Sequence, residues 1–133
     1  MRPITAFLVD NSRFFLTALA AYLPIVSEGA VVIAGSVSHD RDLLPRVAAT
    51  QPEVILLDYK LPTISAPSIL PQLRAQVPQA LLVVVTLHDW EEDRKAALAL
   101  GADAFVSKVM IGRDLWPAMQ RLVAARRGAT AAA

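Results

Sequence analysis

The sequence of 133 residues contains no cysteine, which excludes disulfide bridges and thiolate metal sites and suits a reducing compartment. No apolar run approaches the roughly 18 residues of a membrane-spanning helix, and the first residues show no signal-peptide pattern. The charges nearly cancel, since 13 basic residues face 12 acidic ones. These absences predict a soluble cytoplasmic protein that binds neither a membrane nor, through this domain, a nucleic acid.

Apolar runs are what the sequence has in quantity, since 55% of its residues are hydrophobic. The run 54–57 ends in Asp58 and is typical of a strand buried on both faces of a parallel sheet. Similar runs at 4–9, 30–37, 81–85 and 104–106 alternate with segments of helical spacing. We therefore predict an α/β fold: a five-stranded parallel sheet flanked by five helices in a flavodoxin-like, three-layer sandwich. One domain is expected over residues 1–125, with a frayed or disordered tail or linker stub over 126–133.

Prolines inside the helical segments bear on where those helices begin and end. Pro24 is expected to stop the first helix. Pro45, Pro71 and Pro117 each follow a capping residue by three positions, and the caps would be Asp42, Ser68 and Asp114. A proline in the first turn loses no hydrogen bond, because the N–H groups there have no partner inside the helix. This spacing predicts that three helices begin late.

Polar residues follow four of the five predicted strands. Asp10 and Asn11 follow the first, Asp58 ends the third, Thr86 ends the fourth and Lys108 follows the fifth. In an open parallel sheet, ligands bind beyond the carboxyl ends of the strands. An aspartate at a strand end often only caps the next turn, but four strand ends with complementary polar groups favour a functional site.

The chemistry of these groups suits phosphoryl transfer with a divalent cation. Mg²⁺ prefers a few oxygen ligands and keeps several waters, and Asp58, the side chain of Asn11 and the backbone carbonyl of Lys60 would supply them, with Asp10 holding a coordinated water. A carboxylate such as Asp58 can act as a nucleophile and form an aspartyl phosphate. Lys108 and Thr86 would then contact the oxygens of the phosphoryl group.

The sequence resembles the receiver domain of response regulators, the CheY-like family of two-component signalling. The resemblance extends from Ile4 to about Val123 and rests on four segments: 7–11, 54–58 with Pro62, 84–86 and 101–108. It implies that Asp58 is the phosphoacceptor, Asp10 the first residue of an acidic pair, Thr86 a switch hydroxyl and Lys108 a phosphate-contacting lysine, and that Phe105 is an aromatic residue which turns inward on activation.

The same resemblance implies partners and a mode of switching. Phosphorylation would shift a two-state equilibrium that is read out on the face formed by the fourth helix, the fifth strand and the fifth helix. The expected partners are a sensor histidine kinase or phosphotransfer protein upstream, and a protein partner or a missing output domain downstream. A homodimer through that same face is a further expectation. Beyond self-catalysed phosphotransfer and dephosphorylation, no enzymatic activity is expected.

One departure from the family leaves two interpretations open. Asn11 stands where the family usually has a second acidic metal ligand, so metal binding is expected to be weaker. The chain is either a phosphorylation-competent receiver, since Asp58, Thr86 and Lys108 are all present, or an atypical receiver that signals by protein interaction without phosphorylation.

A haloacid dehalogenase would have an acid two residues after its nucleophile, where this chain has Lys60. His39 and His88 lack spaced metal-binding partners and are expected on the surface.

Overall fold

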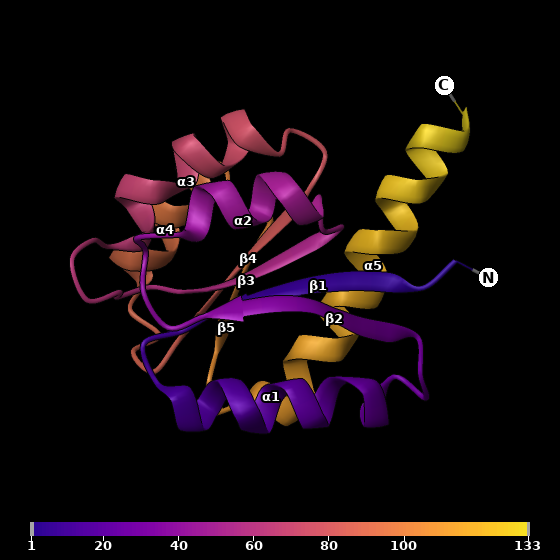
Figure 1. Cartoon of the computed structure of the whole chain (residues 1–133), viewed down its shortest axis with the longest axis horizontal. Helices are drawn as coiled ribbons and strands as arrows, with labels where there is room; N and C mark the ends of the chain where they lie inside the picture. Colours follow the sequence, from indigo (N-terminus) through magenta and orange to yellow (C-terminus); the bar gives the residue numbers. More distant parts are fainter. Residues whose placement is uncertain (1, 133) are drawn as a thin grey trace.

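The computed structural model describes the backbone of residues 2–132 and the side chains of residues 2–129. Within that range five strands alternate with five helices, in the order that the hydrophobic pattern predicts (Figure 1). The elements are β1 (Ile4–Val9), α1 (Arg13–Val26), β2 (Val31–Val37), α2 (Leu43–Thr50), β3 (Val54–Asp58), α3 (Ala66–Gln76), β4 (Leu81–Thr86), α4 (Glu91–Ala99), β5 (Ala104–Ser107) and α5 (Ile111–Ala132).

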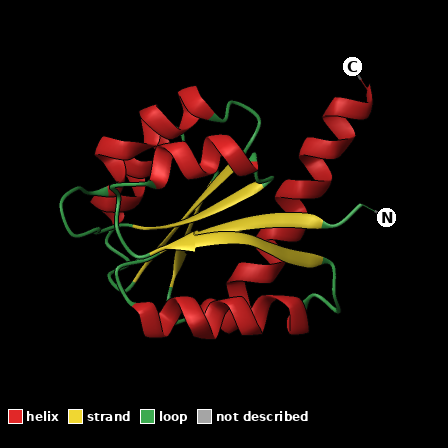
Figure 2. Ribbon diagram, viewed as in Figure 1, coloured by secondary structure: helices red, strands yellow, loops and turns green. Residues whose placement is uncertain are grey.

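The strands form one parallel sheet in the order β2-β1-β3-β4-β5, which lies between two layers of helices (Figure 2). Helices α1 and α5 pack on one face, and α2, α3 and α4 pack on the other. This arrangement confirms the predicted three-layer α/β sandwich. Both β2 and β5 lie at the edges of the sheet, with β3 at its centre.

Strand β3 occupies the centre because both of its faces are apolar. Val54 and Leu56 belong to the cluster under α1 and α5, while Ile55 and Leu57 belong to the cluster under α2, α3 and α4. All four side chains are buried. A strand that is apolar on both faces is stable only where helices cover both, and this position carries Asp58 to the middle of the carboxyl edge.

The predicted helix starts and stops at prolines are mostly wrong. Asp42 is the N-cap of α2 as predicted, although its side chain makes no capping hydrogen bond. Pro24, Pro71 and Pro117 instead lie inside α1, α3 and α5. Each costs one backbone hydrogen bond and crowds the preceding turn. Apolar residues on both sides of Pro71 and Pro117 are buried, which offsets that loss, whereas after Pro24 helix α1 continues only to Val26 and Ile25 is exposed.

The other two predicted caps are corrected accordingly. Helix α3 begins at Ala66 with Ser65 as its N-cap, and α5 begins at Ile111. Ser68 and Asp114 lie inside these two helices, in their first turns, and cap neither of them.

Helix α5 is 22 residues long and continues to Ala132, well past the predicted end of the domain at residue 125. The helix thus includes residues 126–132 of the expected tail, whose fraying stays a prediction; residue 133 lies outside the described range. The reason is tertiary, since Arg126 and Arg127 contact the opposite end of the sheet from the strand-end polar groups. Within residues 2–132, no helix combines the length and the apolar character that crossing a membrane requires.

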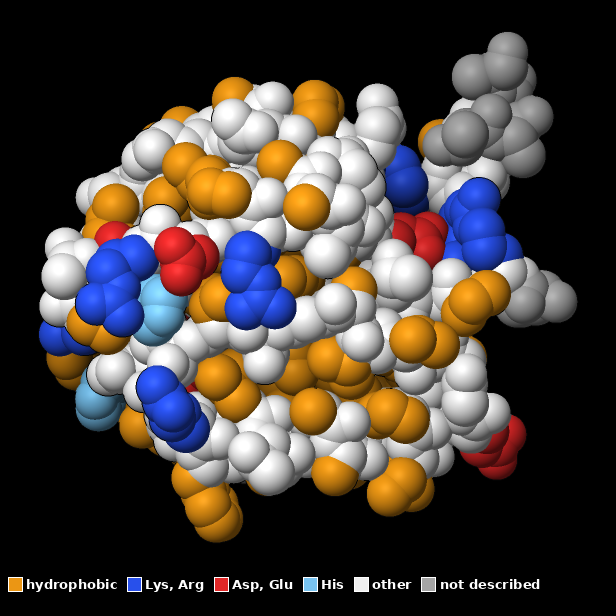
Figure 3. Space-filling view, viewed as in Figure 1, with side chains coloured by type: hydrophobic (Ala, Val, Ile, Leu, Met, Phe, Trp, Pro, Cys, Tyr) orange, Lys and Arg blue, Asp and Glu red, His pale blue; other side chains and the backbone are white. Residues whose placement is uncertain are grey.

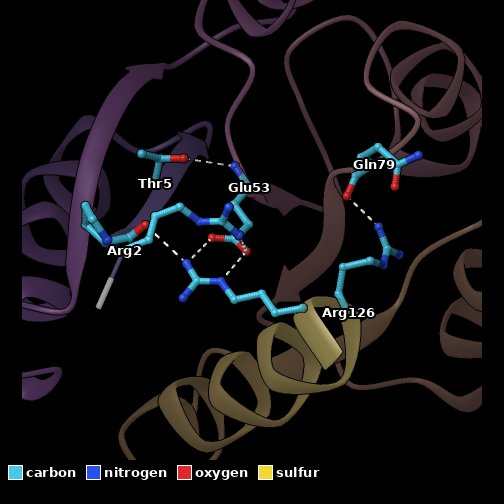
Figure 4. A network of polar contacts seen from close by, with 7 residues as sticks. Arg2, Thr5, Glu53, Gln79 and Arg126 are labelled. Carbon is cyan, nitrogen blue, oxygen red and sulfur yellow. Dashed lines mark hydrogen bonds and ion pairs between the residues drawn. The ribbon is translucent and has the colours of Figure 1, made fainter. Parts of the chain in front are cut away.

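The contacts of these arginines form the polar network in Figure 4. The guanidinium of Arg127 forms a bidentate ion pair with the carboxylate of Glu53, with hydrogen bonds of 2.7 and 2.8 Å. It also donates a hydrogen bond to the backbone carbonyl of Pro3 at 3.2 Å. Arg126 donates to the carbonyl of Gln79. Charge-assisted, two-pronged pairs are stronger than single hydrogen bonds, so this network attaches the last turns of α5 to the starts of β1, β3 and β4.

Candidate functional site

The strand-end polar residues meet at the carboxyl edge of the sheet because four of the strands are neighbours. Asp58 ends β3 beside Val85 of β4, and Thr86 ends β4 beside Ser107 of β5. The backbone N–H of Lys108 donates to the carbonyl of Thr86 at 2.7 Å, which fixes the start of the loop after β5. The structure thus brings together groups that lie far apart in the sequence.

An ammonium group lies between the two carboxylates. Nζ of Lys108 is 2.7 Å from Oδ2 of Asp10 and 3.7 Å from Oδ1 of Asp58. The exposed fractions of the three side chains are 9%, 4% and 12%. The second oxygen of Asp10 accepts a hydrogen bond from the backbone N–H of Ser12 at 2.8 Å. Asp10 is therefore fully engaged, whereas Asp58 makes longer and weaker contacts.

Two carboxylates with one ammonium leave a net negative charge in a poorly solvated place. Burial raises the pKa of the Asp58 carboxyl above its ordinary value, and the charge of Asp10 raises that pKa further. The charge of Lys108 and the backbone N–H groups of Asn11 and Lys60 act in the opposite direction and do not cancel the effect. A divalent cation would relieve this imbalance.

The raised pKa predicts that Asp58→Asn stabilises the fold at neutral pH. The pKa of the Asp58 carboxyl is higher in the folded than in the unfolded chain, so the protonated carboxyl favours folding. This contribution to stability is complete below the unfolded pKa near 3.8 and is lost as the pH rises through the folded pKa. We expect the variant to melt at a higher temperature than the wild type at pH 7 without magnesium. The difference shrinks as the pH falls toward 4.

Thermal unfolding followed by circular dichroism across this pH range measures the difference. Asp89→Asn, which removes an exposed carboxylate outside the ion-pair network, is the control. If the gain in melting temperature of Asp58→Asn stays constant or grows toward acid pH, the pKa of Asp58 is not raised in the folded protein.

The hydroxyl of Thr86 forms hydrogen bonds within the turn that follows β4. Its Oγ1 accepts a hydrogen bond from the backbone N–H of His88 at 3.2 Å and lies 3.3 Å from the carbonyl of the same residue, to which it donates. The side chain lines the same pocket as Asp58. To reach a group bound to Asp58, the hydroxyl has to leave this turn, so the structure shows one of the two positions that a switch hydroxyl would take.

Phe105, the predicted switch aromatic, is buried on the side of the sheet covered by α4. Its ring meets the ring of Tyr59 edge-on, with centroids 6.2 Å apart. Burial raises the pKa of the Tyr59 hydroxyl, and Asp93, to which it is hydrogen-bonded, raises it further. Phe105 is thus linked through Tyr59 to the residue next to Asp58 and to α4. Its role as a switch stays a prediction.

A pocket of about 190 Å³ opens beside Asp58 and includes Asn11, Lys60, Thr86 and Lys108 in its lining. Asn11 is exposed, and its backbone N–H lies 3.4 Å from Oδ2 of Asp58. Among the residues that the structure describes, no three acidic or histidine side chains cluster closely enough to hold a metal ion. A cation here would therefore depend on two carboxylates and on uncharged oxygens.

Phe15 is a site residue that the sequence did not indicate. Nζ of Lys108 lies 4.3 Å from the centroid of the Phe15 ring, within the range of a cation–π interaction. Phe15 lies on α1, and only the packing of α1 against the sheet brings it to the loop after β5. The neighbouring Phe14 is 85% exposed. The helical spacing of Phe15, Leu19 and Leu23 distinguishes Phe15 from Phe14, but it does not indicate the contact with Lys108.

The fold and the strand-edge site together define a receiver-type α/β protein. A family model for the response regulator receiver domain matches residues 6–120. The chain belongs to this family, which confirms the resemblance noted from the sequence, and it is a receiver domain of the kind found in two-component signalling.

Curated relatives that carry this domain are longer than the chain. A protein-glutamate methylesterase/protein-glutamine glutaminase of Symbiobacterium thermophilum is 33% identical over 135 residues, which span 98% of this chain and 36% of that protein. The nitrate/nitrite response regulator protein NarL of Escherichia coli K12 is 26% identical over 122 residues, which span 92% of this chain and 56% of NarL. The chain thus spans a third to just over half of these relatives and corresponds to their receiver part.

Solved structures show the same fold. A two-component response regulator of the LuxR family from Aurantimonas sp. SI85-9A1 superposes with a TM-score of 0.84 at 18% identity, over 93% of this chain and 87% of that one. A CheY-like receiver domain protein from Methanospirillum hungatei JF-1 superposes with a TM-score of 0.76 at 18% identity, over 95% and 98% of the two chains.

Proposed function

We propose that the chain is a phosphorylation-competent receiver in the cytoplasm, and that Asp58 takes a phosphoryl group from a sensor histidine kinase or phosphotransfer protein. One observation carries the proposal: Asp58 lies at the carboxyl edge of the sheet with one oxygen 3.7 Å from Lys108. Unlike Asp10, which has short contacts at 2.7 and 2.8 Å, Asp58 keeps its oxygens available. An available carboxylate beside an ammonium and a pocket is suited to nucleophilic attack on phosphorus.

In the proposed reaction, a carboxylate oxygen of Asp58 attacks the phosphorus atom of the donor. The new bond joins that oxygen to phosphorus, and the bond between phosphorus and the donor breaks, with its electron pair leaving on the donor. Lys108 turns from Asp10 toward the oxygens of the incoming phosphoryl group. The Thr86 hydroxyl leaves its hydrogen bonds with His88 and donates a hydrogen bond to one of these oxygens. These movements stabilise negative charge where it builds up.

The donor atoms fit magnesium. They are a carboxylate oxygen of Asp58, the amide oxygen of Asn11 and the backbone carbonyl of Lys60, with Asp10 placed to hold a coordinated water, and Mg²⁺ is commonly held by one or two carboxylates with waters completing its shell. When bound, magnesium would offset the negative charge of the phosphoryl group. The net negative charge that Asp10 and Asp58 create around one lysine supports this assignment.

The proposed output surface is the face formed by α4, β5 and α5. Trp90, at the N-cap of α4, is 56% exposed and stacks on His88, next to the turn that holds the Thr86 hydroxyl. A movement of Thr86 would therefore reach this face directly, together with Phe105. The partner that reads it is a downstream protein, a second copy of the chain, or an output domain of the kind that the longer relatives contain.

The second candidate function is an atypical receiver that works through protein contact alone. The short contact between Lys108 and Asp10 and the uncharged Asn11 favour it, because a lysine that neutralises the acidic residue closest to it leaves less charge for a metal. In this case the strand-end groups form a satisfied polar network and Asp58 is not modified.

The intact mass of the protein distinguishes the two functions. After incubation with Mg²⁺ and a small-molecule phosphodonor, we expect a single phosphoryl adduct that base removes, and none on Asp58→Asn. Light scattering of the same samples measures whether the adduct promotes dimer formation. If the protein is only monomeric both with and without the adduct, the homodimer is excluded.

The absence of an adduct at saturating Mg²⁺ would favour the atypical receiver. In that case Asn11→Asp is the decisive variant, since an adduct restored by this one change identifies the missing charge as the cause.

A further inference from the structure

A second polar pocket lies at the carboxyl end of the edge strand β2. It has a volume of about 360 Å³ and lies between the first turns of α1 and the start of α2; we call it the β2-edge pocket. Its lining is Arg13, Leu16, Thr17, Ser36, Val37, Ser38, His39, Asp42 and Arg46. It shares no residue with the pocket beside Asp58. Figure 3 shows basic side chains on both sides of this edge, with a histidine near them.

The charges of the β2-edge pocket favour an anion. Two guanidinium groups, of Arg13 on α1 and Arg46 on α2, line it together with one carboxylate, that of Asp42. The neighbouring carboxylate of Asp40 is not in the lining and accepts a hydrogen bond from the hydroxyl of Thr63. The guanidinium of Arg13 makes no hydrogen bond or ion pair with any residue that the structure describes.

Arg46 is held in position rather than free to move. Its Nη1 donates to the carbonyl of Ser36 at 2.9 Å, and its guanidinium lies over the ring of Phe7 at 5.5 Å from the centroid. The close approach depends on Gly35, since a Cβ there would lie 2.8 Å from the Phe7 ring and 3.2 Å from Nη2 of Arg46. The other N–H groups of the Arg46 guanidinium have no hydrogen-bond partner among the described residues. A fixed guanidinium loses less conformational entropy when it binds a ligand.

His39 provides an independent sign of a missing partner. Its Nδ1 atom is buried and has no hydrogen-bond partner among the described residues. Buried polar atoms in native proteins are nearly always paired, so an unpaired one at a pocket is consistent with a ligand or a water as its partner. The sequence predicts an ordinary surface residue here, whereas His39 is partly buried in the lining of this pocket.

We propose that the β2-edge pocket binds the phosphate group of a small molecule. Residues with hydrogen-bonding side chains line the pocket from three elements: Arg13 from α1, Arg46 from α2, and Ser36, Ser38 and His39 at the end of β2. A tetrahedral dianion can accept hydrogen bonds from three sides, whereas a planar carboxylate accepts them mainly within one plane. The two guanidinium groups outnumber the one carboxylate, that of Asp42, so the lining is net positive and suits a phosphate, and 360 Å³ leaves room for a small organic group.

The test is an amide ¹H–¹⁵N NMR titration of the full chain without magnesium, with inorganic phosphate and with glycerol 3-phosphate, at constant ionic strength kept by chloride. We expect saturable shifts at residues 36–39 with both probes. Arg13→Ala weakens binding by about tenfold, the value of one charge-assisted contact. The matched control is Arg41→Ala, which removes the same charge from an exposed position outside the pocket.

The guanidinium of Arg13 pairs with no described residue, and the hydrogen bond from the Thr17 hydroxyl goes to the backbone carbonyl of Arg13, which alanine keeps, so Arg13→Ala is expected to fold normally. Tighter binding of glycerol 3-phosphate than of inorganic phosphate identifies an organic phosphate as the ligand, and equal binding identifies free phosphate. Shifts that do not saturate, equal loss in Arg13→Ala and Arg41→Ala, or shifts confined to Asp58, Thr86 and Lys108 would each overturn the proposal.

Discussion

Replacing Lys108 by methionine is expected to destabilise the protein by about 3–5 kcal/mol at pH 7 without magnesium, because two poorly solvated carboxylates lose the cation between them. Lys108 lies 2.7 Å from Asp10 and 3.7 Å from Asp58, and all three side chains are nearly buried. Methionine keeps the length of the side chain and can pack on the ring of Phe15 through its sulfur. The loss of stability in Lys108→Met therefore measures mainly the removal of the positive charge.

Urea unfolding followed by tryptophan fluorescence measures the free energy. The control is Lys95→Met, because Lys95 is exposed on α4 and a surface change of this kind alters stability by no more than about 0.5 kcal/mol. A second arm replaces Asp10 by asparagine in the Lys108→Met background. Asparagine keeps an oxygen for the N–H of Ser12 while removing the charge that has lost its partner, so it should recover most of the lost stability.

A loss below about 1 kcal/mol in Lys108→Met, or no recovery in the double variant, would show that the carboxylates find other partners. The same variant bears on function. If Lys108 contacts the phosphoryl group as proposed, Lys108→Met also loses the adduct in the mass measurement, whereas Lys95→Met retains it.

Asn11→Asp is expected to raise the affinity for Mg²⁺ by about ten- to hundredfold, which corresponds to roughly 1–3 kcal/mol for one added charge at the metal. The backbone N–H of Asn11 is 3.4 Å from Asp58, and the residue lines the same pocket. An aspartate there adds a third carboxylate to the site. The fluorescence of Trp90, which also lines that pocket, gives the titration signal.

The control for Asn11→Asp adds the same charge elsewhere. Gln72→Glu places a carboxylate on the exposed side of α3, outside the pocket, and should leave the Mg²⁺ affinity unchanged. Without magnesium, Asn11→Asp should be less stable than the wild type, because it adds a like charge near Asp10 and Asp58. Equal Mg²⁺ affinity in the wild type and Asn11→Asp would mean that residue 11 does not ligate the metal.

The strand-end residues are predictable from the sequence because of the physics of parallel sheets. A strand buried on both faces is a continuous apolar run, and the first polar residue after it lies at the carboxyl edge. The ends of these runs alone indicate that Asp58, Thr86 and Lys108 share one edge, and the sheet order β1-β3-β4-β5 brings them together. Their roles in phosphotransfer stay predictions until the adduct is measured.

Helix ends are less predictable because they depend on long-range burial. Local chemistry favours a break at Pro24 and a late start before Pro71 and Pro117, yet the helices continue through all three. At Pro71 and Pro117, the burial of neighbouring apolar side chains outweighs the local cost of a proline. In the same way Arg127 extends α5 by pairing with Glu53, which is 74 residues away in the sequence.

The sequence by itself determined the order of strands and helices, the parallel sheet and the edge at which Asp10, Asp58, Thr86 and Lys108 gather. These features follow from the period of apolar residues and from where each run ends. Only the tertiary structure decided that Lys108 lies against Asp10 and Phe15, and that His39 lies in a pocket with Arg13 and Arg46. Such contacts depend on how helices turn on the sheet and on which rotamers fit there, and neither is encoded in the spacing of residues along one segment.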